Sequence, residues 1–156
     1  MTNIKVNPSN SRIAKVRTYL FTILDTLLTD NKYQINANFL TNDVNNYSLD
    51  RLPVDDNVEQ WIIPTKKYRE VYELRSRNSY GQEVMENLTN IGFFEEFEEI
   101  INSNNKKGVL PDIEGIESIE CLNVGALSIA DTQTSIFAIQ IQINYIKNKT
   151  KEITSL

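Results

Sequence analysis

The side chains that most enzymes use for proton transfer near neutral pH are nearly absent from this sequence. Its 156 residues include no histidine and a single cysteine, Cys121. Because histidine is the usual acid–base catalyst near pH 7 and the commonest metal ligand, histidine-dependent triads, Cys–His dyads and zinc-finger ligand sets are excluded. A lone cysteine also excludes an intramolecular disulfide and fits a reducing compartment. We interpret Cys121, which lies in an alternating strand pattern, as an inert core residue.

Carboxylates remain as candidates for acid–base chemistry or for binding a hard cation. Asp55 and Asp56 are adjacent, but the flanking sequence lacks EF-hand spacing, which favours a turn. A second group lies near a loop rich in proline and glycine and matches no metal motif: Asp112, Glu114 and Glu117. We therefore predict no catalytic residue, no cofactor site and no metal site.

Two patterned groups of charged side chains are candidates for contact with a partner. The acidic helix face lies opposite an apolar stripe at helical spacing and comprises Glu95, Glu96, Glu98 and Glu99. The basic strand face alternates with apolar residues and comprises Lys67, Arg69, Arg75 and Arg77. Solvated surfaces are the alternative for both groups, but we favour pairing between these faces in neighbouring copies of the chain. Trp61 is a further candidate, either a core residue or an interface anchor.

The composition is typical of one globular domain. Hydrophobic residues make up 40% of the chain and charged residues 24%. No stretch approaches the roughly 20 apolar residues of a membrane span, and the N-terminus lacks the apolar run of a secretory signal, so a cytosolic protein is expected. The net charge of −5 disfavours broad DNA binding, which normally requires a basic surface.

An amphipathic helix is predicted to begin at Ser9 or Asn10, with Ser11 as a further candidate cap, and to end at the polar run Thr29-Asp30-Asn31-Lys32. Its apolar stripe recurs at three- and four-residue spacing: Ile13, Val16, Leu20, Ile23, Leu24 and Leu27. Three cations lie near its start, where the helix dipole does not favour them: Arg12, Lys15 and Arg17. An acidic partner elsewhere in the chain is one explanation, but we favour a solvated face.

The remaining patterns are mostly those of strands. Alternation predicts strands over 34–39, 67–77, 119–122, 127–130 and 137–145. Residues 47–52 can form a short strand, and 58–63 are apolar enough for one, which Pro64 limits to an edge or an end. The pattern of 67–77 is imperfect because Glu70 falls on its apolar face and Val71 on its polar face. Two helical patterns, 84–91 and 93–101, are separated at Gly92, since glycine is unfavourable within a helix. We predict one α+β domain over 1–156, ordered over about 9–147, whose mainly antiparallel β-sheet packs against an N-terminal helix and a central helix pair.

The order of these patterns is similar to that of a known family. The charged strand ends in Arg75-Ser76-Arg77, and Tyr80-Gly81 leads into the helical patterns. The segments NIGFFEEF at 90–97 and NNKKGVLPD at 104–112 follow, before a strand-rich C-terminal third. In this order and spacing, residues 10–147 resemble the small tail terminator proteins of tailed bacteriophages and phage-like particles of low-GC Gram-positive hosts. These proteins are also called tail completion or minor capsid proteins.

The resemblance implies an α+β fold and a structural virion protein without catalysis. It implies a hexameric ring that caps the head-proximal end of the tail tube, stops its polymerisation and offers a docking surface to the head–tail connector. The implied partners are further copies of this chain, the tail tube protein, the connector or neck protein, and the tail sheath if the tail contracts. DNA would only pass through the channel, and no membrane is involved. The implied location is the virion tail, after assembly in the host bacterial cytoplasm.

Three alternatives remain open from the sequence. A head-completion or neck connector protein would also form a ring without an active site. A carboxylate-dependent, metal-binding enzyme would need a ligand set that no motif in the chain supplies. A monomeric, non-viral binding module would fit the same composition.

Overall fold

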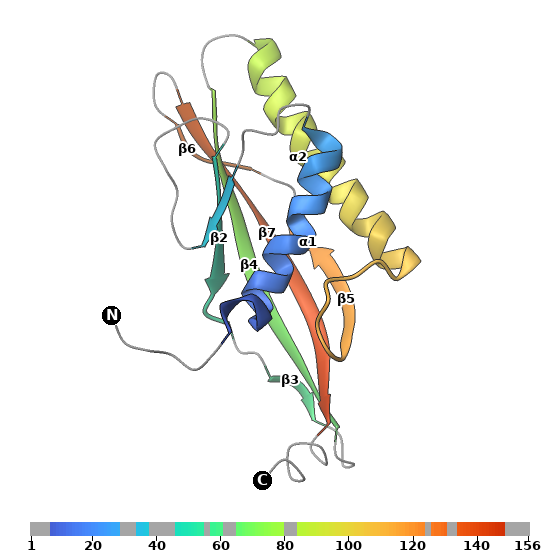
Figure 1. Ribbon diagram of the computed structural model, residues 1–156. Helices are drawn as coiled ribbons and strands as arrows, with labels where there is room; N and C mark the ends of the chain where they lie inside the picture. Colours follow the sequence, from blue (N-terminus) through green and yellow to red (C-terminus); the bar gives the residue numbers. More distant parts are fainter. Residues whose placement is uncertain are drawn as a thin grey trace, which may run out of the picture.

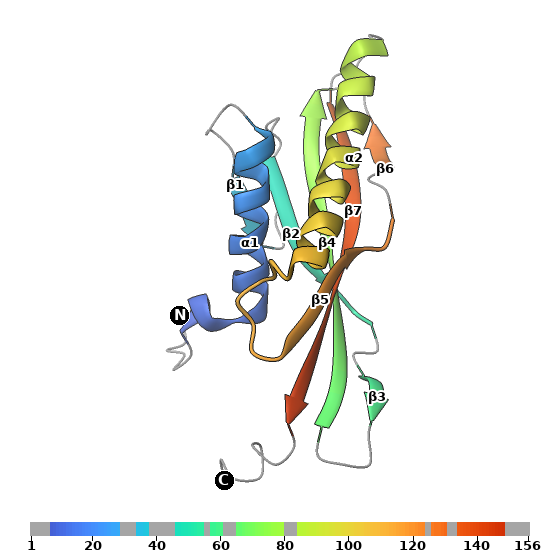
Figure 2. The same cartoon turned by 90° about the vertical axis from the view of Figure 1, so that its right-hand side faces the viewer.

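The computed structural model describes residues 7–28, 34–37, 46–54, 57–60, 65–79, 84–123, 126–130 and 134–148. Within these ranges a seven-stranded sheet carries two α-helices on one face and none on the other (Figures 1 and 2). One of the strand pairings is parallel and the others are antiparallel. The predicted α+β class, with a mainly antiparallel sheet, an N-terminal helix and central helical structure, is therefore confirmed.

Helix α1 (Arg12–Leu27) begins where the sequence provides a capping serine. A short 3-10 turn, η1 (Pro8–Asn10), precedes it, and the Ser11 Oγ accepts the Ala14 N–H at 3.3 Å. This bond satisfies one of the backbone N–H groups that lack a partner at a helix start. The side of α1 that packs on the sheet is buried, through Val16, Tyr19, Leu20, Ile23 and Leu24.

Helix α2 (Val84–Lys107) is continuous, so the predicted break at Gly92 is wrong. Phe94, Phe97 and Ile101 are fully buried under α2, and Phe94 stacks on Phe137 of the sheet with ring centroids 5.7 Å apart. Burial of such aromatic side chains outweighs the roughly 1 kcal/mol that glycine costs within a helix. Among the described residues, no helix is long and apolar enough to cross a membrane.

The predicted end of α2 at Gly108 is confirmed. Gly108 has a φ of 74°, the Val109 N–H bonds to the Asn104 carbonyl at 2.9 Å, and the Gly108 N–H bonds to the Asn105 carbonyl at 3.3 Å. This pattern is a Schellman motif, which uses the left-handed conformation that glycine adopts most easily.

The sheet is built on two long central strands. The strands are β1 (Gln34–Ala37), β2 (Asn46–Leu52), β3 (Asn57–Gln60), β4 (Thr65–Ser79), β5 (Ile116–Cys121), β6 (Ala126–Ala130) and β7 (Thr134–Asn148). Strands β4 and β7 pair along their whole lengths, and the order across the sheet is β1-β2-β4-β7-β5. Strand β3 pairs with β4 at one end of the β4–β7 pair (Figure 1). Strand β6 pairs with β7 at the opposite end.

Alternation along β4 decides which side chains meet the helices. Tyr72 and Leu74 are fully buried on the helix-bearing face, and Glu70 lies there with them at 1% exposure. Val71 points to the other face, where Leu52 of β2 is its direct cross-strand partner and where it is 4% exposed. The two exceptions to the sequence pattern are therefore confirmed: Glu70 lies on the apolar, helix-bearing face of β4, and Val71 lies on the opposite face.

One end of the β4–β7 pair extends beyond both helices (Figure 2). We call this part the strand arm: residues 65–69 of β4, residues 145–148 of β7, and β3. Tyr68 and Tyr145 are direct partners there, and their rings stack with centroids 5.5 Å apart. The arm is joined to the rest of the molecule through the continuous central strands.

Candidate functional site

The basic strand face lies on the side of the sheet without helices, and Arg75 at its centre is already paired. The Arg75 guanidinium lies 2.7 Å from the Asp50 carboxylate on β2 and 4.0 Å from that of Glu73. The Ser48 hydroxyl donates to Asp50 at 3.0 Å, so the carboxylate is fixed in place. This cross-strand network accounts for the charge of Arg75 within one subunit.

Lys67, Arg69 and Arg77 also interact within the chain. The Lys67 Nζ lies 3.4 Å from the Glu117 carboxylate. Glu117 lies at an irregularity of β5, where its register on β7 shifts between Ile116 and Ser118. Arg69 and Arg77 each have an interaction of their own with other residues of the chain. The basic strand face is therefore a mixed surface whose cations interact within the chain. Its pairing with the acidic helix face of a neighbouring copy stays a prediction.

The acidic helix face lies on the outer side of α2, as predicted. Glu95, Glu96 and Glu99 are exposed and Glu98 is half-buried. In the part of the chain that the structure describes, no lysine or arginine lies within ion-pair distance of these four carboxylates. Unlike the basic strand face, this face keeps an uncompensated charge.

Cys121, at the end of β5, is half-buried, and its surroundings favour the protonated thiol. Burial raises the pKa of its thiol to about 12, and the nearby Glu98 and Glu120 carboxylates add to the shift. The thiolate, which is the nucleophilic and metal-binding form, is therefore scarce at pH 7. This agrees with the interpretation of Cys121 as an inert residue.

Two of the three loop carboxylates that were weighed as metal ligands, Asp112 and Glu117, have lysine partners. Asp112 lies 3.4 Å from the Lys15 Nζ on α1, and Glu117 pairs with Lys67 as described above. The described residues contain no group of three or more histidine, cysteine, aspartate or glutamate side chains placed to hold a metal ion. Trp61, Asp55 and Asp56 lie outside the described residues.

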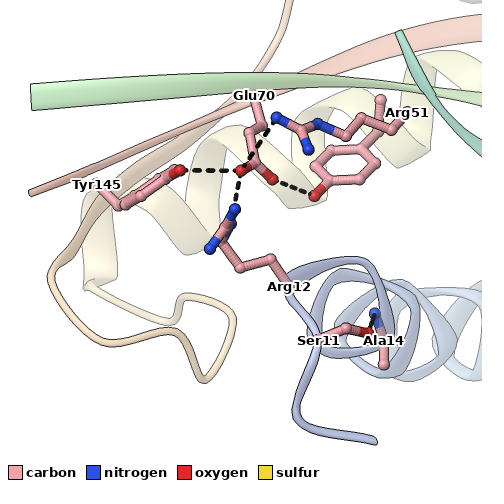
Figure 3. Close-up of polar contacts among 7 residues, drawn as sticks. Ser11, Arg12, Ala14, Arg51, Glu70 and Tyr145 are labelled. Carbon is pink, nitrogen blue, oxygen red and sulfur yellow. Dashed lines mark hydrogen bonds and ion pairs between the residues drawn. The ribbon is translucent and has the colours of Figure 1, made fainter. Parts of the chain in front are cut away.

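A buried carboxylate, Glu70, is the centre of a polar cluster that joins four elements (Figure 3). Its Oε1 accepts the Tyr72 hydroxyl at 2.5 Å, and its Oε2 accepts the Tyr145 hydroxyl at 2.9 Å. The Arg12 Nε donates to Oε2 at 2.5 Å from the first turn of α1, and an Arg51 nitrogen on β2 lies 3.5 Å away. The cluster therefore joins α1, β2, β4 and β7 at a single carboxyl group.

These contacts keep Glu70 ionised. Burial alone would raise the pKa of the carboxyl, but the hydrogen bonds from Tyr72, Tyr145 and Arg12 outweigh it, so the pKa lies below its usual value. Burial and the bond to Glu70 raise the pKa of Tyr72, which keeps its hydroxyl protonated as a donor. The pKa of Arg12 is also raised, because the Glu70 contact outweighs the partial burial of the guanidinium.

The sequence contained two signals for this cluster. Glu70 was the one acidic residue on the apolar side of the strand pattern of 67–77, and Arg12 lay at the unfavourable end of its helix. The favoured explanation of the helix cations, a solvated face, is wrong for Arg12 and for Lys15, which pair with Glu70 and Asp112. Arg17 also has a partner, since its Nε donates to the Ile35 carbonyl at 2.6 Å.

The geometry gives the Glu70 cluster a structural role, in which it holds several elements in fixed relative positions. At 1% exposure the carboxylate is closed to molecules from solvent. A buried, fully hydrogen-bonded carboxylate of this kind fixes the elements that supply its donors. It sets the position of the α1 N-terminus where the strand arm begins, and so holds the arm and the helix layer in one arrangement.

The basic strand face and the acidic helix face thus lie on opposite sides of a two-layer subunit. They are separated by the sheet and by the buried side chains beneath α2, so they do not pair within one chain. In comparisons with known proteins, no family model and no curated sequence matches this chain.

Proposed function

We propose that this protein is a tail terminator of a tailed bacteriophage or phage-like particle. In this role copies of the chain form a ring, a hexamer in the family that it resembles, on the head-proximal end of the tail tube. The ring stops polymerisation of the tube and provides the surface on which the head–tail connector docks. The role requires recognition and assembly and involves no catalytic step.

One observation carries the proposal: the subunit presents two unlike charged surfaces on opposite sides. The helix-free face of the sheet is lined with charged side chains such as Arg75, Asp50 and Glu73. The outer side of α2 carries the exposed carboxylates Glu95, Glu96 and Glu99. A ring of identical subunits is built from heterologous contacts, in which two different surfaces of each copy meet, and this subunit offers such a pair.

The order of elements gives further support. An N-terminal helix, three short strands, the long strand β4, the long helix α2 and a strand-rich C-terminal part follow one another along the chain. The resemblance to the tail terminator family rests on a similar order, with a strand pair before the charged strand and a helix pair after it. In the proposed assembly the remaining surfaces meet the tail tube protein, the connector and, in a contractile tail, the sheath, while DNA only passes through the channel.

Deletion of the gene from its own particle tests the proposal most directly. Without a terminator, tube polymerisation loses its stop signal, so electron micrographs are expected to show abnormally long tails or polysheath. Supplying the wild-type protein from a plasmid should restore uniform tails and serves as the control. Tails of normal length beside unattached heads would overturn the proposal in favour of a head-completion or neck protein.

A further inference from the structure

Two lysines of the strand arm, Lys66 and Lys147, differ from Lys67 and Arg75 of the basic strand face. Lys66 and Lys147 are direct cross-strand partners on β4 and β7. Within the described ranges, neither ammonium group lies within ion-pair distance of a carboxylate, whereas Arg75 and Lys67 both do. The arm therefore carries two positive charges that no carboxylate of the described residues offsets.

Both ammonium groups lie near the same aromatic ring of the arm. The Nζ of Lys66 and that of Lys147 each lie 5.1 Å from the centre of the Tyr68 ring, which stacks on Tyr145. Attraction to the ring restrains both side chains, while their like charges repel each other. A carboxylate bound between them would relieve this repulsion, and the restraint lowers the entropy lost when it binds.

The two lysines lie where the sheet projects past the helices. By strand alternation, Lys66 and Lys147 are on the helix-bearing face of the sheet, together with Tyr68 and Tyr145. Tyr145 is 2% exposed, with the Arg12 guanidinium of α1 lying 5.1 Å from its ring centre, whereas Lys66, Lys147 and Tyr68 are partly exposed. Among the described residues, the ends of β4 and β7 beyond Tyr145 extend past α1 and α2 (Figure 2), so a helix from another molecule can approach this face there.

The acidic helix face has the complementary chemistry. Glu95 and Glu99 are four residues apart on α2, Glu96 and Glu99 are three apart, and all three are exposed. Like charges at these spacings destabilise a helix by about 0.2–0.5 kcal/mol per pair. Cations supplied from outside would relieve this repulsion as well.

These two surfaces are too far apart to meet within one chain. Phe94, next to the acidic helix face, stacks on Phe137 of β7, whereas Lys147 lies ten residues further along the same strand. At about 3.3 Å per residue this separation is roughly 30 Å. A long side chain spans only a small part of that distance.

We infer that the strand arm of one subunit receives the acidic helix face of α2 from a second copy of this chain, with Lys66 and Lys147 paired to Glu95, Glu96 and Glu99. The inference rests on the proposed ring and identifies the surfaces that join its subunits. It moves the cationic side of the contact from the self-paired basic strand face to the arm. Because the two surfaces differ, each subunit can offer its arm to one neighbour and its acidic helix face to another, and repetition of this heterologous contact builds a ring where the rotation closes.

Charge reversal on each surface, alone and together, tests the contact. The variants of the full chain are K66E/K147E, E95K/E99K and the combination of all four changes. K106E/K107E is the matched control, because Lys106 and Lys107 are exposed and make no ion pair among the described residues, and it changes the net charge as much as K66E/K147E. Self-association is measured by size-exclusion chromatography with light scattering and by sedimentation, at low and at high salt.

Each single-surface variant is expected to weaken self-association at least about tenfold at low salt, and the combined variant to recover most of it. The control should stay near wild type, and added salt should weaken the wild type. A wild type that stays monomeric at low salt, or a combined variant no better than the single-surface variants, would overturn the inference. Loss of duplex DNA binding by K66E/K147E with unchanged self-association would overturn it in favour of a nucleic-acid contact.

The result can be separated from the test of the proposed function. K66E/K147E is also introduced into the particle, where tail length is scored by electron microscopy. If deletion of the gene lengthens tails but every charge variant assembles and terminates them normally, the terminator function stands and the inferred contact fails. If deletion leaves tail length unchanged, the proposed function fails whatever the charge variants do.

Discussion

A single carboxylate in the core, Glu70, shows how one residue can relate several elements to one another. Transfer of an unpaired charge into a protein interior is strongly unfavourable, so a buried ion is kept only when its lone pairs are satisfied. Here two tyrosine hydroxyls and an arginine supply the donors from β4, β7 and α1. An apolar residue at this position would not orient these elements relative to one another, and it would leave the three donors without an acceptor.

Replacement of Glu70 by glutamine is expected to destabilise the protein by about 2–4 kcal/mol at pH 7, because Arg12 loses its counter-ion and charged hydrogen bonds become neutral. Part of the cost is avoided, since the Arg12 side chain is 37% exposed and can be hydrated. Urea unfolding measures the effect. E73Q is the control on the same strand: its carboxylate is partly exposed, with one contact at 4.0 Å, so a change below about 1 kcal/mol is expected.

The pH dependence of stability gives a second readout for Glu70. Its pKa in the folded protein lies below the unperturbed value of 4.5, so its contribution is complete above pH 4.5 and is lost as the pH falls through the folded pKa. Wild type and E70Q should therefore converge in stability as the pH is lowered below 4.5. A difference between them that does not change with pH would contradict the assigned ionisation.

Two glycines with positive φ make a further prediction at the residue scale. Gly115 has a φ of 77°, and a Cβ atom there would lie 2.1 Å from the Ile146 carbonyl oxygen, whereas Gly108 has open space around it. G108A is expected to cost about 1 kcal/mol for backbone strain alone, and G115A at least about twice that, because β5 must also move away from β7. Thermal unfolding compares the two variants, and equal losses would contradict the close approach at Gly115.

At the scale of elements, α2 shows tertiary packing prevailing over local preference. Gly92 separates two apolar stripes in the sequence, yet the helix passes through it without interruption. Aromatic contacts hold the second stripe on the sheet, including Phe94 on Phe137 at 5.7 Å and Phe93 with Tyr47 at 6.4 Å. These contacts begin directly after Gly92, where the sequence predicted a break, and they stabilise the helical conformation there.

Replacement of Gly92 by alanine is expected to stabilise the protein by about 0.5–1 kcal/mol, through the higher helix propensity of alanine. Nothing lies within 4 Å of the position that a Cβ atom would take. The gain is measured as a rise in the urea midpoint with an unchanged slope. A loss of stability would mean that α2 bends at this position in solution.

At the scale of the whole molecule, one apolar cluster joins both helices to the sheet. Its buried members come from α1, α2 and five strands, among them Leu24, Phe97, Ile35, Ile119 and Ile139. With the helices confined to one face, the molecule has an exposed helical side, a polar sheet side and a projecting arm. A subunit of this shape has distinct surfaces for successive neighbours, which the proposed ring requires.

The sequence by itself determined the elements and most of their faces. The stripe of α1 and the end of α2 at Gly108 were predictable, because periodicity and capping are local properties. The strands were predictable for the same reason, although the ends of β4 and β7 extend beyond the alternating pattern where long-range pairing continues. Ser11, which caps α1, was one of three adjacent candidates, and the sequence favoured Ser9 or Asn10. The outward direction of the acidic helix face followed from the apolar stripe opposite it.

Only the tertiary structure decided which charges have partners. Arg12 and Glu70 are 58 residues apart, and nothing in the local pattern of either could show that they meet. The same holds for Arg75 with Asp50 and for Lys67 with Glu117, whose pairing leaves the basic strand face largely satisfied. Ion pairing depends on distances of a few ångströms between segments remote in sequence, whereas secondary structure depends on neighbours along the chain.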